Sequence, residues 1–454
     1  MKACSLFIKT LLICLTFSAL NSCRKSDNRP DYPAGSQENI NSWILDSMKV
    51  YYYWNNNLPG SPGLNTDPSS FFKGIRNGAD RFSALVNPDF PENYPPSLVH
   101  ALGFDWITLQ TSDGQVQTVI TLVVPGSGGA DKGLSRGDVV KTINGTIPSA
   151  GNIASLTSNC ILQHSADLEL AGKTGLIKVS QLMIAEVPLY SFKIFPSGGK
   201  TYGYLFLNSF EDTAVPLFKK AFTAFKQHQV QELIVDIRYN PGGSVPVAAA
   251  LAAMIAPKTT EGATFVEYRG NAKAGSRKSS FGAELKRLQQ AGFAELSAYQ
   301  LNLNRVYVLT GNHTASASEL LINSLRPYIT VIQSGQQTLG KDMASFVIKD
   351  YRNPQIVPKW EIYPMIFKLY NAEGKGDYSN GLLPDQEVDE LSALPLKPFG
   401  NLSDPLVQRC LQMNSVMAGK GQVRVESISE KPRVIFDSRV PVDLKTSLTI
   451  ARPY

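Results

Sequence analysis

The apolar positions of this chain change their spacing along its length, beginning with a helical pattern in residues 39–88. The first run of large apolar residues falls near one face of a helix, and the triplet 58–60 (Leu-Pro-Gly) should end that helix. A second short helix is expected around Phe71 and Phe72, and a turn-rich stretch at 87–91 marks a boundary. The apolar residues of the first run are Trp43, Leu45, Met48, Tyr52 and Trp54.

Residues 95–190 show the shorter apolar runs that are typical of β-strands. Strands are predicted at residues 104–109, 116–124, 139–143 and 176–179, and an Asn-Gly turn at 144–145 follows the third of them. This part of the chain is therefore predicted to be a mainly-β domain.

Residues 200–410 alternate between strand-like and helix-like runs, which favours an α/β layer with at least some parallel strands. Strands are predicted at 204–207, 233–237, 306–309 and 330–332, and helices at 216–226, 247–255 and 316–325. The helix at 247–255 is apolar on nearly every side, so it should be buried. Residues 258–300 interrupt the alternation with a basic, Gly/Ser-rich stretch, which predicts an exposed insertion or lid. The segment after residue 418 is polar, with one strand-like run at 433–436.

Residues 1–23 have the features of an export signal. Two lysines near the start precede an apolar run that is too short to span a bilayer, and the run ends in Leu20-Asn21-Ser22-Cys23. That ending resembles the bacterial lipobox, in which cleavage exposes a cysteine that becomes lipidated. Because a polar tether (24–38) follows at once, lipidation of Cys23 is favoured over an ordinary secretory signal with an incidental cysteine. This predicts a cell-envelope protein, lipid-anchored to the outer membrane of a Gram-negative bacterium.

Composition and charge narrow the class of protein. With 454 residues, 43% hydrophobic and 18% charged, the chain can build about three cored domains. The net charge of +6 falls to +4 when Lys2 and Lys9 leave with the signal, which is too mild to indicate a nucleic-acid partner. Four histidines without a His-Glu-x-x-His pattern exclude the common zinc proteases, and neither metal nor cofactor is expected. Cys160 and Cys410 could pair after export, although two buried free thiols are the favoured interpretation.

One motif lies in the predicted β domain. Residues 133–145 contain a Gly-Leu-x-x-Gly-Asp turn that runs into a strand ending in Asn-Gly, and this pattern resembles the PDZ domain. Upstream, Leu102, Gly103 and Phe104 match most of the PDZ loop whose backbone N–H groups bind a chain-terminal carboxylate. The alternative is a β domain that only packs against its neighbour.

Three further motifs carry candidate chemistry. The strand at 233–237 leads to a turn with bare backbone at Gly242 and Gly243, which can aim N–H groups at an oxyanion. The segment Thr314-Ala315-Ser316-Ala317-Ser318-Glu319 places a serine among small residues at a helix start, although Ser316 and Glu319 also have the spacing of a capping box. Lys341 follows Gly340, and a buried lysine with a lowered pKa can act as a base; a solvated surface lysine is the alternative.

Taken together and in this order, the four motifs closely resemble the carboxyl-terminal processing (tail-specific) serine peptidases over residues 40–410. The resemblance implies an ATP-independent endopeptidase that cleaves unfolded or tail-exposing polypeptides through an acyl-enzyme. In it, Ser316 is the nucleophile, Lys341 is the general base, and the oxyanion donors are the N–H groups of Ala317 and of Gly242 or Gly243.

The family fold is a crotonase-like (ClpP/crotonase) α/β core with an inserted mainly-β PDZ domain and a small N-terminal helical subdomain. On this chain the resemblance implies a helical subdomain at 39–92, a PDZ-like domain at 93–190, a peptidase core at 191–417 that includes the insertion 258–300, and a C-terminal tail at 418–454.

One departure from the family pattern concerns the base. The family often has Gln four residues after the lysine, where it helps to orient it, and this chain has Ser345 there. Asp342 would raise the pKa of Lys341 if its carboxylate faced inward. His313, three residues before Ser316, is interpreted as structural. The competing hypotheses are a catalytically inactive protease-like binding protein and a scaffold that acts through its PDZ-like domain alone.

Overall fold

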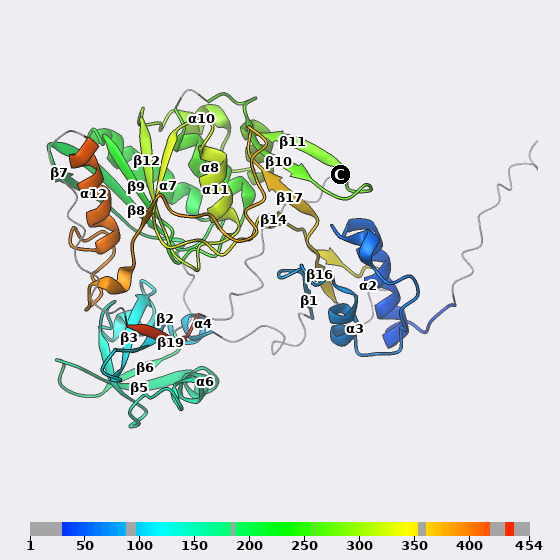
Figure 1. Cartoon of the computed structure of the whole chain (residues 1–454), viewed down its shortest axis with the longest axis horizontal. Helices are drawn as coiled ribbons and strands as arrows, with labels where there is room; N and C mark the ends of the chain where they lie inside the picture. The colour runs from blue at the N-terminus through cyan, green and yellow to red at the C-terminus, as the bar shows by residue number, and fades with distance from the viewer. Residues whose placement is uncertain are drawn as a thin grey trace, which may run out of the picture.

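The computed structural model describes residues 30–87, 97–182, 187–257, 259–352, 360–417 and 432–439. These residues form an α/β core, a β domain made mainly of residues 97–182, and a helical N-terminal part (Figure 1). The predicted signal with Cys23, and most of the tail after residue 418, lie outside the described residues. None of the helices described has the length and apolar character needed to cross a membrane.

The core is built on a six-stranded sheet in the order β18-β13-β12-β9-β8-β7. All neighbours in it are parallel except the antiparallel edge pair β7 and β8. The four strands predicted from the sequence are confirmed and lie side by side at the centre of this sheet. The strands are β7 (Leu189–Ser197), β8 (Lys200–Leu207), β9 (Glu232–Asp236), β12 (Arg305–Thr310), β13 (Thr330–Gly335) and β18 (Gln386–Glu387).

Helices cover both faces of this sheet, because both sets of alternating side chains are apolar. Leu233 and Val235 of β9 pack with α7 (Ala214–Gln227), α8 (Val245–Ile255) and α11 (Ala317–Leu325) in one cluster. Ile234 packs on the opposite face with α12 (Pro405–Met417). The prediction that the 247–255 helix is buried is confirmed, since every residue of α8 is buried.

The prediction of an exposed insertion at 258–300 is wrong for those residues of the segment that pack into the core, while many of the others are exposed. It forms a hairpin of β10 (Thr264–Arg269) and β11 (Ser276–Ser280), followed by α9 (Phe281–Leu288) and α10 (Phe293–Ser297). The hairpin joins a second sheet in the order β11-β10-β17-β14, and Phe265 and Phe281 are fully buried. The Gly/Ser-rich, basic composition belongs to the hairpin turn and the outer face, while alternate residues of β10 face the core.

The β domain carries a six-stranded antiparallel sheet in the order β19-β2-β3-β4-β5-β6. Helices α4 (Leu98–Leu102), α5 (Gly128–Asp131) and α6 (Ile153–Gln163) accompany it. The four predicted strands are confirmed as β2, β3, β4 and β6, whereas β5 and α6 were not predicted. The strands are β2 (Phe104–Gln110), β3 (Val116–Val123), β4 (Val139–Ile143), β5 (Ser165–Leu170), β6 (Ile177–Ser180) and, from the C-terminal tail, β19 (Arg433–Asp437).

The N-terminal part contains α2 (Gln37–Tyr51), η2 (Asn55–Asn57), α3 (Pro68–Ile75) and the short strand β1 (Ala84–Val86). Helix α2 ends before the predicted Leu-Pro-Gly stop, at Tyr51. β1 pairs with β16 (Glu361–Tyr363), which also pairs with β15 (Ile348–Lys349). This small sheet attaches the N-terminal part to the core. The remaining elements are β14 (Met343–Ala344), β17 (Phe367–Tyr370) and η4 (Glu390–Ser392).

The two cysteines of the folded region are separate. Cys160 lies buried in the β domain on α6, and Cys410 lies buried on α12 of the core. Both are free thiols, as the sequence favoured. Burial raises the pKa of the Cys160 thiol to about 11, so neither the position nor the chemistry suits a nucleophile.

Candidate active site

Ser316 stands on a strained turn between β12 and α11. Its backbone has φ 63° and ψ −116°, outside the regions that non-glycine residues normally adopt, and its side chain is fully buried. Within the described residues its Oγ has no hydrogen-bond partner. The Ser316 N–H donates to Glu319 Oε2 at 2.8 Å, so the glutamate half of a capping box is present. The hydroxyl itself is left available for other chemistry.

The turn after β9 presses against this serine. Gly242 has φ 115°, and a Cβ added to it would lie 2.7 Å from Ser316 Cβ and 2.9 Å from the backbone nitrogen of Ala317. Only a glycine allows this approach. The N–H of Gly242 donates to Asn240 Oδ1 at 2.8 Å, and the neighbouring Gly243 has φ 135°. The structure thus brings Gly242 and Ala317 beside the serine, while Gly243, the next residue, lies against the backbone of Phe210. The Gly242 N–H is already engaged.

Lys341 is buried, with 7% of its surface exposed. Burial lowers the pKa of its ammonium to about 8, while the negative charges of Glu319 and Asp80 oppose this shift. The solvated-lysine alternative is therefore excluded. Its Nζ lies 5.4 Å from the centre of the Phe82 ring. Because Ser316 Oγ is without a partner among the described residues, Ser316 and Lys341 are not hydrogen-bonded to each other in this arrangement.

Glu319 is a residue of this site that the sequence revealed only as a helix cap. Its buried carboxylate accepts the N–H groups of Ser316, Gly340 and Lys341 at 2.7–2.8 Å, together with the hydroxyl of Thr338. One side chain thus fixes the serine turn and the lysine loop relative to each other. The Ser-x-x-Glu spacing was the signal, but its partners in the 338–341 loop are distant in sequence.

Three neighbouring residues do not contact the pair in the ways considered from the sequence. Ser345 is fully buried, and among the described residues its Oγ bonds to nothing, so it does not orient Lys341 here. Asp342 forms an ion pair with Lys368 at 3.4 Å instead of facing Lys341. His313 Nε2 lies 2.7 Å from Asp437 Oδ2 in β19, in keeping with its interpretation as structural.

Comparison with known proteins identifies the family. A family model described as peptidase family S41 matches residues 201–388, and the model of the S41 N-terminal domain matches residues 39–84. These two matched segments together make up about half of the chain. The chain belongs to peptidase family S41.

The similar proteins agree with this membership. The chain is 24% identical over 258 residues to a chloroplastic C-terminal processing peptidase of Tetradesmus obliquus, which is 52% of this chain and 51% of that protein. It is likewise 24% identical over 258 residues to the carboxy-terminal processing protease CtpB of Bacillus subtilis, which is 55% of this chain and 46% of the relative. The match thus spans about half the length of each curated relative. A solved structure from Bacteroides fragilis, assigned to the S41 proteases, is 26% identical, with a TM-score of 0.68 over 87% of this chain and 100% of the other.

In this S41 chain a buried polar network connects the glycine turn at Gly242 and Gly243 to the β domain. Arg238, two residues before Asn240, bonds the carboxylates of Asp236 and Asp404 and contacts Glu390 at 3.2 Å. Arg136 of the β domain donates to Glu390 at 2.7 Å and to the hydroxyl of Tyr239 at 2.8 Å. Burial alone would raise the pKa of Glu390, but the positive charges of Arg136 and Arg238 hold that pKa at about 2.

The predicted carboxylate-binding loop of this S41 chain is closed. Leu102 and Phe104 are buried in the core of the β domain and do not border an open pocket, which corrects that part of the prediction. Gly103, with φ 78°, ends α4, and its N–H donates to the carbonyl of Val99 at 2.8 Å. A Cβ on Gly103 would lie 2.0 Å from Ser127 Cβ, so the residue is required for close packing.

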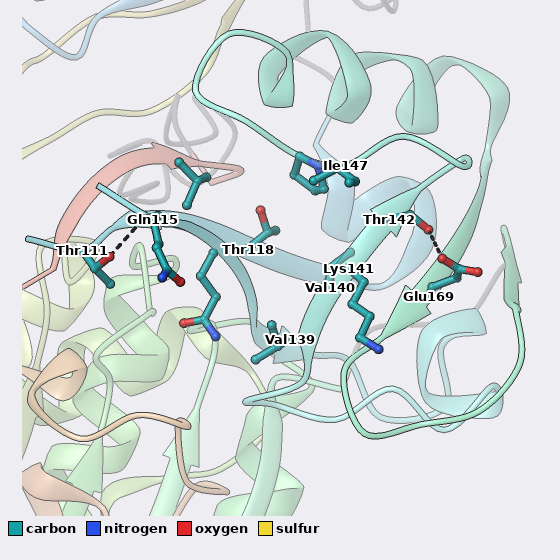
Figure 2. A pocket seen from close by; sticks show the side chains of 12 residues that line it. Thr111, Gln115, Thr118, Val139, Val140, Lys141, Thr142, Ile147 and Glu169 are labelled. Atoms are coloured by element: carbon teal, nitrogen blue, oxygen red, sulfur yellow. Dashed lines mark hydrogen bonds between the residues drawn. The ribbon is translucent and has the colours of Figure 1, made fainter. Parts of the chain in front are cut away.

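An open cavity of about 550 Å³ lies on another face of the β domain (Figure 2). Its lining comes from β3, β4, β5 and the adjoining loops, and includes Lys141, Ile147 and the hydrogen-bonded pair Thr142 and Glu169. None of the residues predicted for the active site or for peptide binding lines it. This cavity offers positions for control substitutions in the β domain.

Proposed function

We propose that this chain is an ATP-independent serine endopeptidase in which Ser316 attacks the peptide carbonyl and Lys341 is the general base. The observation that carries the proposal is the placement of an unpartnered serine hydroxyl on a strained turn, against Gly242 and beside a buried lysine whose pKa is lowered to about 8. A lysine with this pKa is neutral in a minor fraction of the molecules at pH 7 and in most of them above pH 8, and the neutral amine can accept the serine proton.

The reaction would proceed through an acyl-enzyme. The Ser316 oxygen attacks the carbonyl carbon while its proton moves to Lys341 Nζ, which later passes that proton to the leaving amine. The N–H groups of Ala317, at the start of α11, and of Gly243 would hold the developing oxyanion. The N–H of Gly242 is not free to bind the oxyanion, because it donates to Asn240 Oδ1. Gly242 instead contributes by packing closely against Ser316. A rotation of the Lys341 side chain away from Phe82 would complete the pair.

Substrate selection would rest on the β domain. Its Gly-Leu-x-x-Gly-Asp turn and its sheet support assignment as a PDZ domain inserted before a crotonase-like core, and β2 already accepts an antiparallel strand on its open edge. The substrates would be unfolded or tail-exposing polypeptides. The 24% identity to two C-terminal processing peptidases supports this substrate class.

The location proposed is the cell envelope, with a lipid on Cys23 holding the protein to a membrane. The support is the lipobox-like sequence 20–23 and the polar tether that follows it. A Cys23→Ser variant is expected to leave the membrane fraction after cell lysis. Retention of this variant to the same extent as wild type would refute the lipid anchor.

The decisive test of the chemistry is Ser316→Ala against denatured polypeptide. Cleavage is expected to fall by at least about 10³-fold while the fold persists. Ser324→Ala is the matched control, because that serine is equally buried, lies in the helix that Ser316 precedes, and has a hydroxyl that is also unpartnered among the described residues. Equal cleavage by wild type and Ser316→Ala would exclude a serine peptidase.

The alternative is a protease-like protein that binds polypeptides, or a PDZ-type scaffold, without cleaving them. Two observations favour it: Ser345 occupies the position where the family often has Gln, and Lys341 lies over Phe82 without a bond to Ser316. In that case wild-type protein would bind a denatured polypeptide and leave it intact, and Ser316→Ala would bind it equally well.

A further inference from the structure

The open edge of the β domain is occupied by the chain's own C-terminal tail. β19 pairs antiparallel with β2, with Arg433 opposite Gln110 and Asp437 opposite Ile107. Figure 1 shows it in red beside β2, more than 300 residues away in sequence. The sheet order makes β2 the second strand and β19 the edge, so removal of β19 would expose the backbone N–H and C=O groups of β2.

Polar side chains anchor the end of this tail segment. Ser438 Oγ donates to Asp105 Oδ1 at 2.9 Å, and Arg439 Nε lies 2.9 Å from Asp105 Oδ2. Within the described residues, these are the contacts found for the Asp105 carboxylate, which is 1% exposed. A buried carboxylate without such partners would be strongly unfavourable. The β domain is therefore shaped for an occupant that brings a hydroxyl and a cation to Asp105.

The same segment also contacts the core beside the active-site turn. Asp437 bonds His313, which precedes Ser316 by three residues. The Arg439 guanidinium lies 4.0 Å from the centre of the Tyr239 ring, and Tyr239 directly precedes Asn240 of the glycine turn. The tail thus bridges the predicted peptide-binding strand and the two loops that form the candidate catalytic site.

Several features show that β19 is held less firmly than the strands within the domain. It is five residues long, Val434 is 44% exposed, and the register shifts between Val434 and Phe436. Phe436 packs only partly against the core of the domain. By contrast, β3 on the other side of β2 is eight residues long and has five consecutive buried residues, 118–122. Because β19 is a short edge strand, an added peptide strand could take its place on β2.

We propose that the segment 433–439 is an internal ligand of the peptide-binding edge, which a substrate strand must displace before cleavage. The proposal rests on the proposed function, since it takes the β2 edge as the substrate site. Because the tail is tethered, its effective concentration at the edge is on the order of millimolar, and it excludes weak or short partners.

The partner that fits the vacated edge is an extended polypeptide segment with the chemistry of the tail. It would place an apolar or aromatic side chain where Phe436 packs, a carboxylate at His313, and a guanidinium or ammonium two residues later at Asp105 and Tyr239. A substrate strand of this kind makes the same contacts as the tail that it displaces. The binding free energies of the two are therefore similar, and the outcome of the competition depends on substrate concentration.

The first test locks the tail in place. Gln110 and Arg433 are directly paired across the two strands, so Gln110→Cys with Arg433→Cys allows a disulfide at the outer end of β19. The native thiols Cys160 and Cys410 are buried and should not interfere. The probe is a fluorescent synthetic peptide with the sequence of residues 432–439, and its binding is measured in the Ser316→Ala background. Oxidation is expected to weaken binding on the order of tenfold or more, and reduction to restore it. Oxidised Arg433→Cys alone is the control and should bind like the parent.

The second test loosens the tail. Asp437→Ala with Arg439→Ala removes the anchors at His313 and Asp105, and peptide affinity is expected to rise on the order of tenfold. Glu169→Gln, at the cavity on another face of the domain, should leave affinity unchanged. Unchanged binding in both the locked and the loosened proteins would overturn the proposal and make β19 a permanent strand.

These binding measurements do not depend on catalysis, so the two proposals can fail separately. Loss of the tail effect, with cleavage still abolished by Ser316→Ala, would refute the internal ligand alone. Conversely, if wild type cleaves nothing while locking still prevents peptide binding, the internal ligand stands and the peptidase is refuted.

Discussion

At the scale of single residues, two unusual backbone conformations meet at the candidate nucleophile. Ser316 has φ 63° and Gly242 has φ 115°, and their atoms would collide if Gly242 carried a side chain. A non-glycine residue held in such a region costs about 1–3 kcal/mol, which the surrounding bonds must offset. Asn240 contributes to this, because its carbonyl accepts both the Ala315 N–H and the Ser318 hydroxyl. Strain at this position keeps the Ser316 hydroxyl off the helix cap and available for attack.

The pKa of Lys341 predicts how cleavage depends on pH. Burial lowers that pKa to about 8, and the neutral amine is the form that can accept the Ser316 proton. Activity should therefore be low at pH 6, reach half of its maximum near pH 8 as Lys341 loses its proton, and level off about one pH unit higher. The measurement is kcat/KM between pH 6 and 10 on a denatured substrate. Lys341→Arg should be inactive throughout, and a wild-type profile that stays flat across pH 8 would exclude Lys341 as the base.

The close approach of Gly242 predicts that an added methyl group is damaging. In Gly242→Ala the new Cβ would lie within 3 Å of Ser316 Cβ and Ala317 N, at a φ that alanine rarely adopts. We expect kcat to fall about 10²-fold as the oxyanion donors shift, together with a lower Tm. Gly74→Ala in α3 is the control, because nothing lies within 4 Å of its new Cβ, and both values should stay near wild type. Normal turnover of Gly242→Ala would show that the turn is not part of the site.

At the scale of elements, the site depends on Glu319, which joins the start of α11 to the loop before β14. It accepts four hydrogen bonds at a position that is fully buried. The serine and the lysine come from different elements, so their separation is set by this carboxylate and by the central strands. Glu319 also acts electrostatically, because its charge raises the pKa of Lys341 against the effect of burial.

Glu319→Gln should alter both position and pKa. The Gln amide would place an NH₂ group where the Glu319 carboxylate now accepts N–H and O–H donors. At least one of these hydrogen bonds is then lost, and the free energy of unfolding should fall by about 1–3 kcal/mol. Removal of the negative charge should also lower the Lys341 pKa, which moves the midpoint of the residual pH profile below that of wild type. Glu284→Gln is the control: it is a buried glutamate paired with Arg287 away from the site, and should destabilise without moving the midpoint. An unmoved midpoint in Glu319→Gln would contradict the electrostatic role.

The sequence predicts those elements whose signal is local. The strands of the core sheet are continuous apolar runs, and α8 is apolar all round, so both could be identified. Helix α6 was not predicted because its buried face is short and includes Thr157, while Ser155, Ser158 and Asn159 lie on the exposed side. β5 was not predicted although its buried residues alternate with polar ones, which is the pattern of a strand with one face in the core. The hairpin of β10 and β11 was mistaken for an exposed insertion because its turn dominates the composition.

Long-range partners explain what the sequence could not reveal about the site. Ser316, Lys341 and the glycine turn are found from motifs, because each has a characteristic local sequence. Three of the four bonds of Glu319 and the pairing of β19 with β2 join segments that are distant along the chain, and no local pattern encodes them. The burial of Leu102 and Phe104 is likewise decided by tertiary packing.

At the scale of the whole molecule, Arg136 connects the β domain to the core through several contacts. It bonds Glu390, the Tyr239 hydroxyl and the carbonyl of Lys397, and its guanidinium lies 4.5 Å from the centre of the Phe399 ring. Glu390 is shared with Arg238, which is fixed in turn by Asp236 and Asp404. A displacement of the β domain is therefore transmitted to the residues that immediately precede the glycine turn.

Arg136→Ala should consequently impair catalysis from outside the site. The substitution leaves Glu390 and the Tyr239 hydroxyl with one partner fewer in a buried setting. The free energy of unfolding should therefore fall by about 3 kcal/mol, which is the lower end of the range for a broken buried ion pair. The lower end is expected because Arg238 still contacts Glu390. The kcat for a denatured polypeptide should fall as well, since Tyr239 keeps its bond to Glu390 but loses the Arg136 donor that ties both residues to the β domain. Urea unfolding and steady-state kinetics measure the two effects. Lys173→Ala is the matched control: it removes a partly exposed ion pair with Asp138 inside the β domain, and its effect should stay within about 1 kcal/mol with kcat unchanged. If Arg136→Ala lost stability but kept the kcat of wild type, the β domain would be attached to the core without influencing the reaction.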